Sequence, residues 1–195
     1  VALSGLAVTA VGGNGFYAQQ DPASDDYDGV DFSGIFVFLG AAPTVSRGDI
    51  IDIEGTIGDF FGQGQLSEAT VTTTGSGVVI DPLLVPMADI VTDGARAEAL
   101  ESALVRVDAL TVDGSVELTP SDVFATVGGL RVGDSLFDLS PLPGDGDMLQ
   151  FVAGPLNFSF EHTRVLPRGL EDIRYANLRI APVNARVVLD STFDV

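Results

Sequence analysis

Apolar and polar residues alternate in short runs along most of the chain. Alternation with a period of two places apolar side chains on one face of a strand, so each run predicts a half-buried β-strand. The chain's 23 glycines and 10 prolines separate many of the runs and predict turns. Short strands at roughly regular spacing indicate an all-β sandwich or barrel. The runs span residues 6–11, 35–39, 50–57, 69–73, 104–112, 124–127, 149–153, 178–180 and 183–189.

A different pattern occupies residues 94–104, where alanine and leucine recur at helical spacing. We expect one short helix there, between two groups of strands. The first group covers residues 1–80 and the second covers residues 100–174. A connector at residues 81–99 joins the two groups, and a tail at residues 175–195 follows them.

Each group ends with a similar unit, at residues 48–67 and 146–166. Each unit has a Gly-Asp turn, an alternating strand, a mid-strand glycine and two phenylalanines. Five short strands that close as a Greek-key barrel form an OB-fold. We therefore predict an all-β fold of two coupled OB-like Greek-key β-barrels with a short connecting helix and a C-terminal extended strand; a single β-sandwich is the alternative. The repeated residues are Gly48, Gly55, Phe60 and Phe61 in the first unit, and Gly146, Gly154, Phe158 and Phe160 in the second.

The charge of the chain limits the kinds of partner that it can bind. Nine basic and 28 acidic residues give a formal charge of −19, and every basic residue is an arginine. Because a polyanion repels phosphates, nucleic-acid binding is disfavoured.

The absence of cysteine excludes disulfides and thiolate sites. The chain has no run of 18 apolar residues, so we expect no membrane span. It begins at Val1 without a basic leader, and we expect a mature extracellular or cell-surface product, or an excised domain.

Catalytic motifs are missing from the chain. The single histidine, His162, has no partner imidazole, and neither a Gly-x-Ser-x-Gly motif nor a phosphate-binding Lys-Ser/Thr loop occurs. Catalysis needs a nucleophile, a base or a metal held in a constellation. We therefore expect no enzymatic activity. The triplet at residues 157–159 fits the N-linked glycosylation pattern, which chance also produces.

A cation is the best candidate for a ligand. One loop holds five carboxylates in eleven residues. Calcium favours six to eight oxygen ligands, which carboxylates and carbonyls of a flexible loop supply. The spacing is not that of an EF-hand, and a solvated acidic loop is the alternative. The predicted calcium ligands are Asp21, Asp25, Asp26, Asp28 and Asp31.

Aromatic side chains offer a second possibility. Phe16, Tyr17 and Tyr27 lie near the acidic loop in sequence and are candidates for stacking a ligand, as OB-folds stack single strands. The surrounding charge is unfavourable for a polyanion. For the phenylalanine pairs of the repeated units we expect barrel core on one side and packing between the units on the other.

Seven short motifs follow one another along the chain, at residues 15–19, 21–22, 34–37, 48–55, 60–66, 100–107 and 165–173. In this order they resemble the OB-fold domain of large secreted bacterial nucleases, over residues 3–174 of this chain. The resemblance implies a non-catalytic OB region that accompanies separate metal-dependent nuclease or phosphatase domains in calcium-associated surface proteins. This sequence carries no such catalytic domain.

The last residues, 178–195, lie beyond that resemblance and still alternate. An extended segment outside a closed domain pairs with its own sheet edge, leads into another domain, or pairs with the edge of another copy. In the third case, head-to-tail addition builds an open filament. The candidate assembly residues are Leu178, Ile180, Val183, Ala185, Val187 and Leu189.

These observations favour a non-enzymatic extracellular structural module that associates with itself, or with a larger surface assembly, through its tail. The alternative is an accessory module of a secreted nuclease or phosphatase that binds nucleic acid or polysaccharide.

Overall fold

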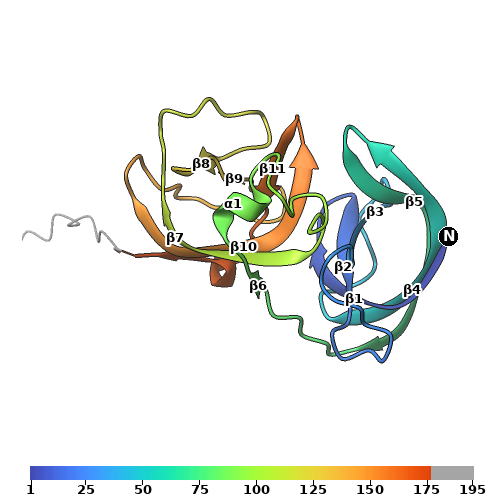
Figure 1. Ribbon diagram of the computed structural model, residues 1–195. Coiled ribbons are helices and arrows are strands. Elements are labelled where there is room, and N and C mark those ends of the chain that lie inside the picture. Colours follow the sequence, from blue (N-terminus) through green and yellow to red (C-terminus); the bar gives the residue numbers. More distant parts are fainter. Residues whose placement is uncertain (177–195) are drawn as a thin grey trace, which may run out of the picture.

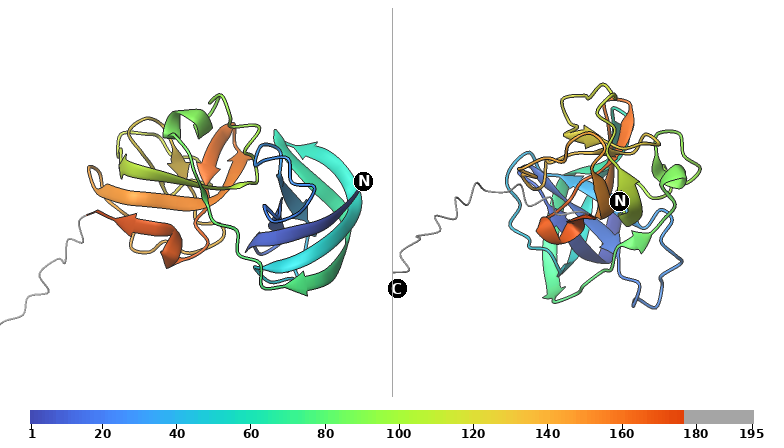
Figure 2. Two further views of the ribbon diagram at one scale, coloured as in Figure 1. Left: turned by 60° about the horizontal axis from the view of Figure 1, so that its bottom comes forward. Right: turned by 90° about the vertical axis from the view of Figure 1, so that its left-hand side faces the viewer.

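The computed structural model describes residues 1–176 and divides them into two β-rich bodies that lie side by side (Figures 1 and 2). The first body contains β1 (Ala2–Val11), β2 (Gly15–Gln20), β3 (Gly34–Phe38), β4 (Asp49–Phe60) and β5 (Gln63–Ser76). The second contains β6 (Leu83–Leu84), α1 (Met87–Ile90), β7 (Leu104–Thr111), β8 (Phe124–Ala125), β9 (Arg131–Val132), β10 (Met148–Ser159), β11 (His162–Val165), η1 (Leu170–Asp172) and β12 (Ile173–Tyr175). The prediction of an all-β protein is confirmed.

The first body is a closed barrel in the order β1-β2-β3-β5-β4. Its neighbouring strands are antiparallel except β3 and β5, which run parallel. The apolar members of the alternating runs fill its interior, as period-two patterning requires. Closure satisfies the strand edges that an open sheet leaves unpaired. The buried core comprises Leu6, Val8, Phe16, Ala18, Val37, Val45, Ile51, Ile53 and Leu66.

The second body is a sheet in the order β6-β7-β10-β11-β9-β8, with β12 also paired to β10. Five of its strands pair in the order β7-β10-β11-β9-β8, which corresponds to the order β1-β4-β5-β3-β2 around the barrel. Each body has one parallel pair among these strands, β9 with β11 here and β3 with β5 in the barrel. An isolated antiparallel bridge joins Val112 to Thr126, next to the ends of β7 and β8. A separate core of Leu, Val and Ile side chains lies inside this sheet.

The repeated unit occupies corresponding places in the two bodies, as the first strand of a long hairpin: β4 with β5, and β10 with β11. Its mid-strand glycine is required by close packing. A Cβ atom at Gly55 would lie 2.5 Å from Cδ2 of Leu66, and one at Gly154 would lie 2.1 Å from the carbonyl oxygen of Leu166. The neighbouring segment thus passes too close for any side chain at these two positions.

The predicted helix at residues 94–104 is wrong. Residues 95–100 form turns, and the only α-helix within residues 1–176 is α1, earlier in the connector. Tertiary hydrogen bonds compete with the helix here: Phe32 N donates to Ala99 O over 2.6 Å, and Ser102 N donates to Leu156 O over 2.7 Å. Ser102 also has a φ of 65°, which ends any helix.

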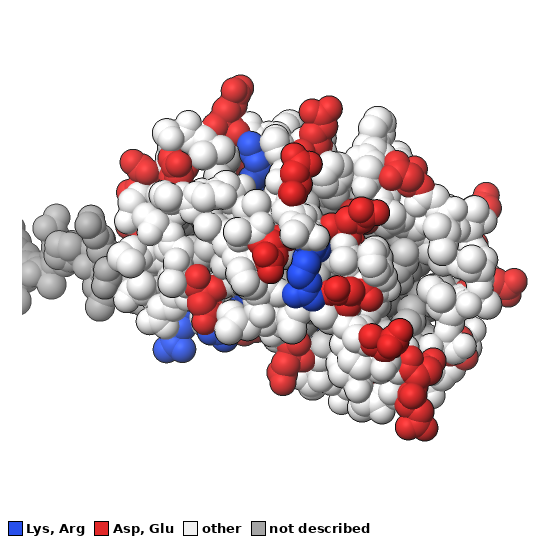
Figure 3. Space-filling view, in the orientation of Figure 1, with Lys and Arg blue, Asp and Glu red and all other residues white. Residues whose placement is uncertain are grey.

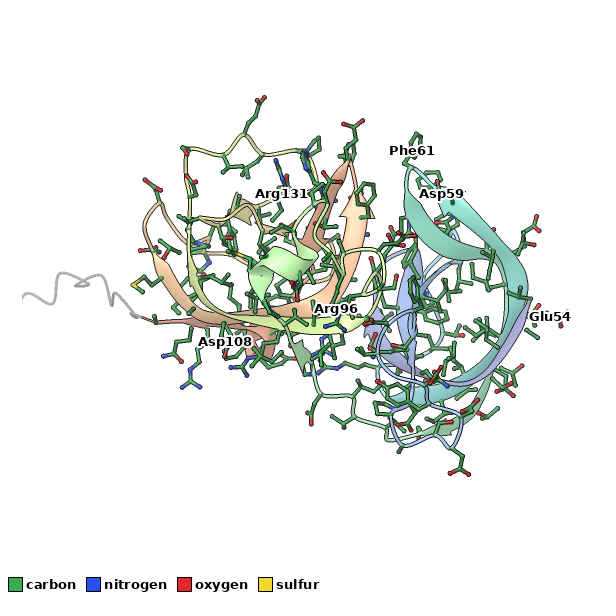
Figure 4. The ribbon with its side chains drawn as sticks, viewed as in Figure 1. Glu54, Asp59, Phe61, Arg96, Asp108 and Arg131 are labelled. Carbon is green, nitrogen blue, oxygen red and sulfur yellow. The ribbon has the colours of Figure 1, made fainter. Side chains whose placement is uncertain are left out.

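The two bodies meet in a tight, partly polar interface. A Cβ atom at Gly34 of β3 would lie 2.4 Å from the backbone nitrogen of Ala103, so backbones of the two bodies touch directly. The buried Gln19 of β2 accepts a hydrogen bond from Leu104 N at the start of β7, over 2.9 Å. Arg96, labelled at the junction in Figure 4, pairs with Asp31 across it. These contacts fix how the bodies face one another.

Candidate functional site

Two hairpin tips, those of β4–β5 and β10–β11, lie on the same side of the molecule (Figure 1). Each tip carries exposed phenylalanines. The β4–β5 hairpin turns at Phe60 and Phe61, and the β10–β11 hairpin turns at Phe160. Phe61 and Phe160 have φ values of 53° and 48°, an uncommon conformation for aromatic residues. Their exposed fractions are 59% for Phe60, 80% for Phe61 and 56% for Phe160. Large apolar side chains therefore occupy turn positions where polar residues are usual.

The tips border an open groove of about 930 Å³, which we call the aromatic groove. Phe36 and Phe38 of β3 line it together with the tip residues. The hairpins come close to each other at Gly62, where a Cβ atom would lie 2.5 Å from the ring of Phe158. Figure 4 shows Phe61 at the outer end of its hairpin. The lining residues are Asn14, Phe36, Phe38, Phe60, Phe61, Gln63, Gln65, Phe158, Ser159, Phe160 and Glu161.

The groove has an apolar lining with a few polar groups, most of them neutral. Its polar side chains are the amides of Asn14, Gln63 and Gln65, the hydroxyl of Ser159 and the carboxylate of Glu161. None of the arginines within residues 1–176 lines it.

Six of the seven arginines in residues 1–176 are held elsewhere in ion pairs with the protein's own carboxylates. Figure 3 shows acidic side chains scattered over both bodies and few cationic ones. A polyanionic ligand thus finds no counter-charge in the groove.

A buried polar cluster lies beside the groove, at the boundary between the bodies. The side-chain nitrogen of Asn157 donates to the Tyr17 hydroxyl over 3.1 Å and to the Gln63 amide oxygen over 2.8 Å. The Asn157 oxygen accepts from Arg164 over 3.3 Å. Burial raises the pKa of Tyr17 to about 12, so its hydroxyl keeps its proton at neutral pH. One side chain of β10 thus links β2 and β5 of the barrel to β11.

Arg164 anchors this cluster within the second body. Its side chain is fully buried, and its Nε donates to Asp122 over 3.0 Å. Asp122 also accepts from the backbone nitrogen of Thr119 over 2.8 Å and pairs with Arg131, which Figure 4 labels. Burial alone would raise the pKa of Asp122, but these hydrogen bonds outweigh it and hold that pKa below its usual value. The carboxylate therefore stays charged, as a buried ion pair requires.

Glu101, just after the connector, ties the second body to the hairpin that carries Phe60 and Phe61. Its Oε1 accepts from the backbone nitrogen of Gly64, near the start of β5, over 2.7 Å. Burial, together with the charges of Asp59 and Glu98, raises the pKa of Glu101 to about 7, against the hydrogen bond from Gly64. This contact titrates near neutral pH.

The structure does not gather the acidic loop into a metal site. Asp31 pairs with Arg96, Asp26 accepts from Ser24, and Asp21 accepts from the backbone nitrogen of Ala23. No group of three or more carboxylates or histidines with metal-binding geometry occurs within residues 1–176. Calcium binding at Asp21, Asp25, Asp26, Asp28 and Asp31 stays a prediction.

The predicted stacking residues lie mostly inside the protein. Phe16 is in the barrel core and Tyr17 in the polar cluster, with exposed fractions of 0% and 3%, so neither ring faces solvent. Tyr27 is half-buried in the acidic loop. Instead, the hairpin phenylalanines that we expected to pack inside line the groove. The sequence carried a signal for this exposed placement, because two phenylalanines lie at or near the turn of each repeated unit.

Three further expectations concern single segments. Asn157, of the glycosylation triplet, has an exposed fraction of 9% and its amide is fully engaged, so the folded protein does not present it. The assembly residues Leu178 to Leu189 lie outside the described residues. Within residues 1–176, no helix has the length and apolarity to cross a membrane.

The chain matches no protein-family model, no curated protein and no solved structure.

Replacing Glu101 with glutamine tests its titration. The folded pKa of about 7 lies above the ordinary 4.5, so the folded state holds a proton that the unfolded chain releases between these values. The free energy of unfolding therefore falls as pH rises through this window. In the native protein we expect the free energy of unfolding to fall by on the order of 1 kcal/mol between about pH 5 and about pH 8, a small value because Glu101 is partly solvated. In Glu101→Gln this fall should be absent.

Urea unfolding at both pH values measures this difference. Glu54→Gln, at the exposed Glu54 on the outer face of the barrel (Figure 4), is the control for the loss of one negative charge. An identical pH dependence in Glu101→Gln and the native protein would contradict the assignment.

Proposed function

We propose that this protein is a non-enzymatic extracellular binding module whose ligand occupies the aromatic groove. The observation that carries the proposal is the clustering of six phenylalanines from three strand segments around one open groove. Three of them, at the hairpin tips, are more than half exposed. Exposed aromatic side chains rimmed by polar groups are typical of recognition surfaces. Folding alone does not require them, because both bodies already have separate buried cores.

We further propose that both bodies are OB-like barrels. The shared order of strand pairings and the bridge between Val112 and Thr126 support this for the second body. OB-folds bind ligands on the face of strands 2 and 3 and on the loops between strands 1 and 2 and strands 4 and 5. In the first barrel, Asn14 lies in the first of these loops, Phe36 on β3 and Phe61 in the second loop. The groove therefore lies where this fold class binds ligands, which is an argument by analogy.

The resemblance to secreted nucleases suggests an accessory role beside a catalytic domain. Nucleic acid fits the groove poorly, because the net charge is −19 and no arginine lines it. An uncharged polymer meets no such repulsion. A polysaccharide-binding accessory module is therefore the form of the proposal that agrees best with the charge.

Replacing Phe61 and Phe160 together with serine should weaken binding, because it removes an exposed phenylalanine from each hairpin tip of the groove. The measurement is retention on immobilised neutral polysaccharides, a cationic peptide and oligothymidylate. Each lost aromatic contact is worth roughly 1–3 kcal/mol, so the double variant should bind at least about tenfold more weakly. Thermal stability should stay unchanged, since both side chains are exposed.

Phe32→Ser is the matched control, because Phe32 has an exposed fraction of 74% and does not line the groove. It should bind as the native protein does. Equal binding by the groove variant and the native protein, or no binding of any of these ligands, would refute the proposed function.

A second candidate function is self-association through the tail. β12 pairs with β10 on one side, and residues 1–176 provide no strand on its other side. The tail follows β12 directly in sequence, and its alternating residues suit the addition of a strand to a neighbouring copy. Deleting residues 178–195 should convert concentration-dependent oligomers to monomers, as light scattering measures. A full-length protein that is monomeric at all concentrations would exclude this function.

Calcium remains a proposed ligand of the acidic loop. Bound calcium would stabilise the folded state by mass action, so chelation should lower the melting temperature in a calorimetric scan. Asp25→Asn with Asp28→Asn should lose that response, while Asp108→Asn, far from the loop in sequence, should retain it. A melting temperature that chelation leaves unchanged would count against the site.

A further inference from the structure

The aromatic groove adjoins a smaller cavity of about 190 Å³ between the two bodies, which we call the inner chamber. The chamber and the groove share Asn14, Phe36, Gln63 and Ser159 in their linings. Their surroundings differ in chemistry, because the chamber is also bordered by Tyr17, Asn157 and Arg164 and by the hydroxyls of Ser121 and Ser135. A polar chamber thus adjoins an apolar groove. Its volume far exceeds the space that one water molecule needs.

Gln63, which lines both spaces, has an unpartnered donor. Its side-chain oxygen accepts from Asn157 over 2.8 Å, whereas its side-chain nitrogen has no hydrogen-bond partner. Gln63 has an exposed fraction of only 7%. Buried polar groups in folded proteins are nearly always paired, so an orphaned amide nitrogen beside a cavity needs a partner. This donor favours a ligand that offers a hydrogen-bond acceptor.

Hydrogen-bond donors predominate where Arg164 borders the chamber. Arg164 and Arg131 both pair with the single carboxylate of Asp122, so these three side chains together carry a charge of +1. Asn157 and Gln63 present amide groups beside them. This environment favours oxygen atoms that accept hydrogen bonds, and it disfavours an ammonium or guanidinium group. A cationic peptide would therefore not place its charge in the chamber.

We propose that the ligand is a neutral glycan, with one sugar unit placing its hydroxyls in the inner chamber and neighbouring units lying against the phenylalanines of the groove. This inference rests on the proposed function. A sugar ring combines hydroxyl oxygens, which satisfy Gln63, with apolar C–H faces, which cover Phe36 and Phe61. A purely apolar ligand leaves the Gln63 donor unpaired, and a polyphosphate is repelled by the net charge of −19.

The test measures binding of soluble dextran, xylan and galactomannan to the full chain by isothermal titration calorimetry. Gly13 lines the chamber at an exposed position, and a Cβ atom there meets no atom within 4 Å, so a side chain can be added at this rim without a backbone clash. Gly13→Trp should obstruct the rim of the chamber and weaken glycan binding roughly tenfold or more, because the sugar hydroxyls lose access to their partners. Gly13→Ala is the matched control and should bind within about twofold of the native protein.

Gln63→Leu provides a second, independent variant. It removes the orphaned donor at similar volume and should weaken glycan binding roughly three- to tenfold, the usual effect of losing one neutral hydrogen bond. Thermal melting identifies any loss of folding. If Gln63→Leu unfolds, Gly13→Trp still decides the question.

The outcomes separate this inference from the proposed function. Glycan binding that Gly13→Trp and Phe61→Ser both weaken supports the inference. Glycan binding that depends on Phe61 but not on Gly13 or Gln63 overturns the chamber assignment and leaves the proposed function standing. Retention of the cationic peptide or oligothymidylate, with no glycan bound, overturns the glycan inference alone. No binding of any probe overturns both.

Discussion

The hydrogen bonds of the Asn157 side chain are the interaction on which the arrangement of this protein depends. One amide on β10 bonds to Tyr17 and Gln63 of the barrel and to Arg164 of the second body. Each partner is buried, so breaking one bond leaves a polar group without water to replace it. The cost of an unpaired buried group holds the two bodies in one relative position. That position also brings the two hairpin tips together.

The aromatic groove exists because a single hairpin motif occurs in both bodies. The turns at Phe61 and Phe160 lie roughly a hundred residues apart, yet they border the same space. Their exposed side chains contribute little to either core and sit beside neutral amides rather than cations. The core and the proposed binding surface are therefore separated by position: strand interiors stabilise the fold, and the turns supply the exposed aromatic side chains. Glu101, at the start of the second group of strands, connects the two, because it accepts a hydrogen bond from Gly64 of the hairpin.

Particular segments show where reasoning from sequence succeeded and failed. The hairpins of the repeated unit, with their mid-strand glycines, follow from local patterning, and the structure places them in corresponding strands. The prediction of a helix at residues 94–104 failed because tertiary hydrogen bonds to Phe32 and Leu156 outweighed a weak local helix propensity. Tyr17 and Phe16 were expected at the surface because they neighbour an acidic loop in sequence. In the folded chain both side chains face inward, because strand register decides which face each one occupies.

The sequence by itself determined the all-β class, the two groups of strands and the strongly acidic surface, because period-two alternation, turn residues and net charge are properties of neighbouring residues or of composition. Only the tertiary structure decided the groove, the inner chamber and the buried pairing of Arg164 with Asp122. Those features depend on how the barrel and the second sheet pack against each other. That packing is set by contacts such as Gly34 against Ala103, which no local pattern encodes.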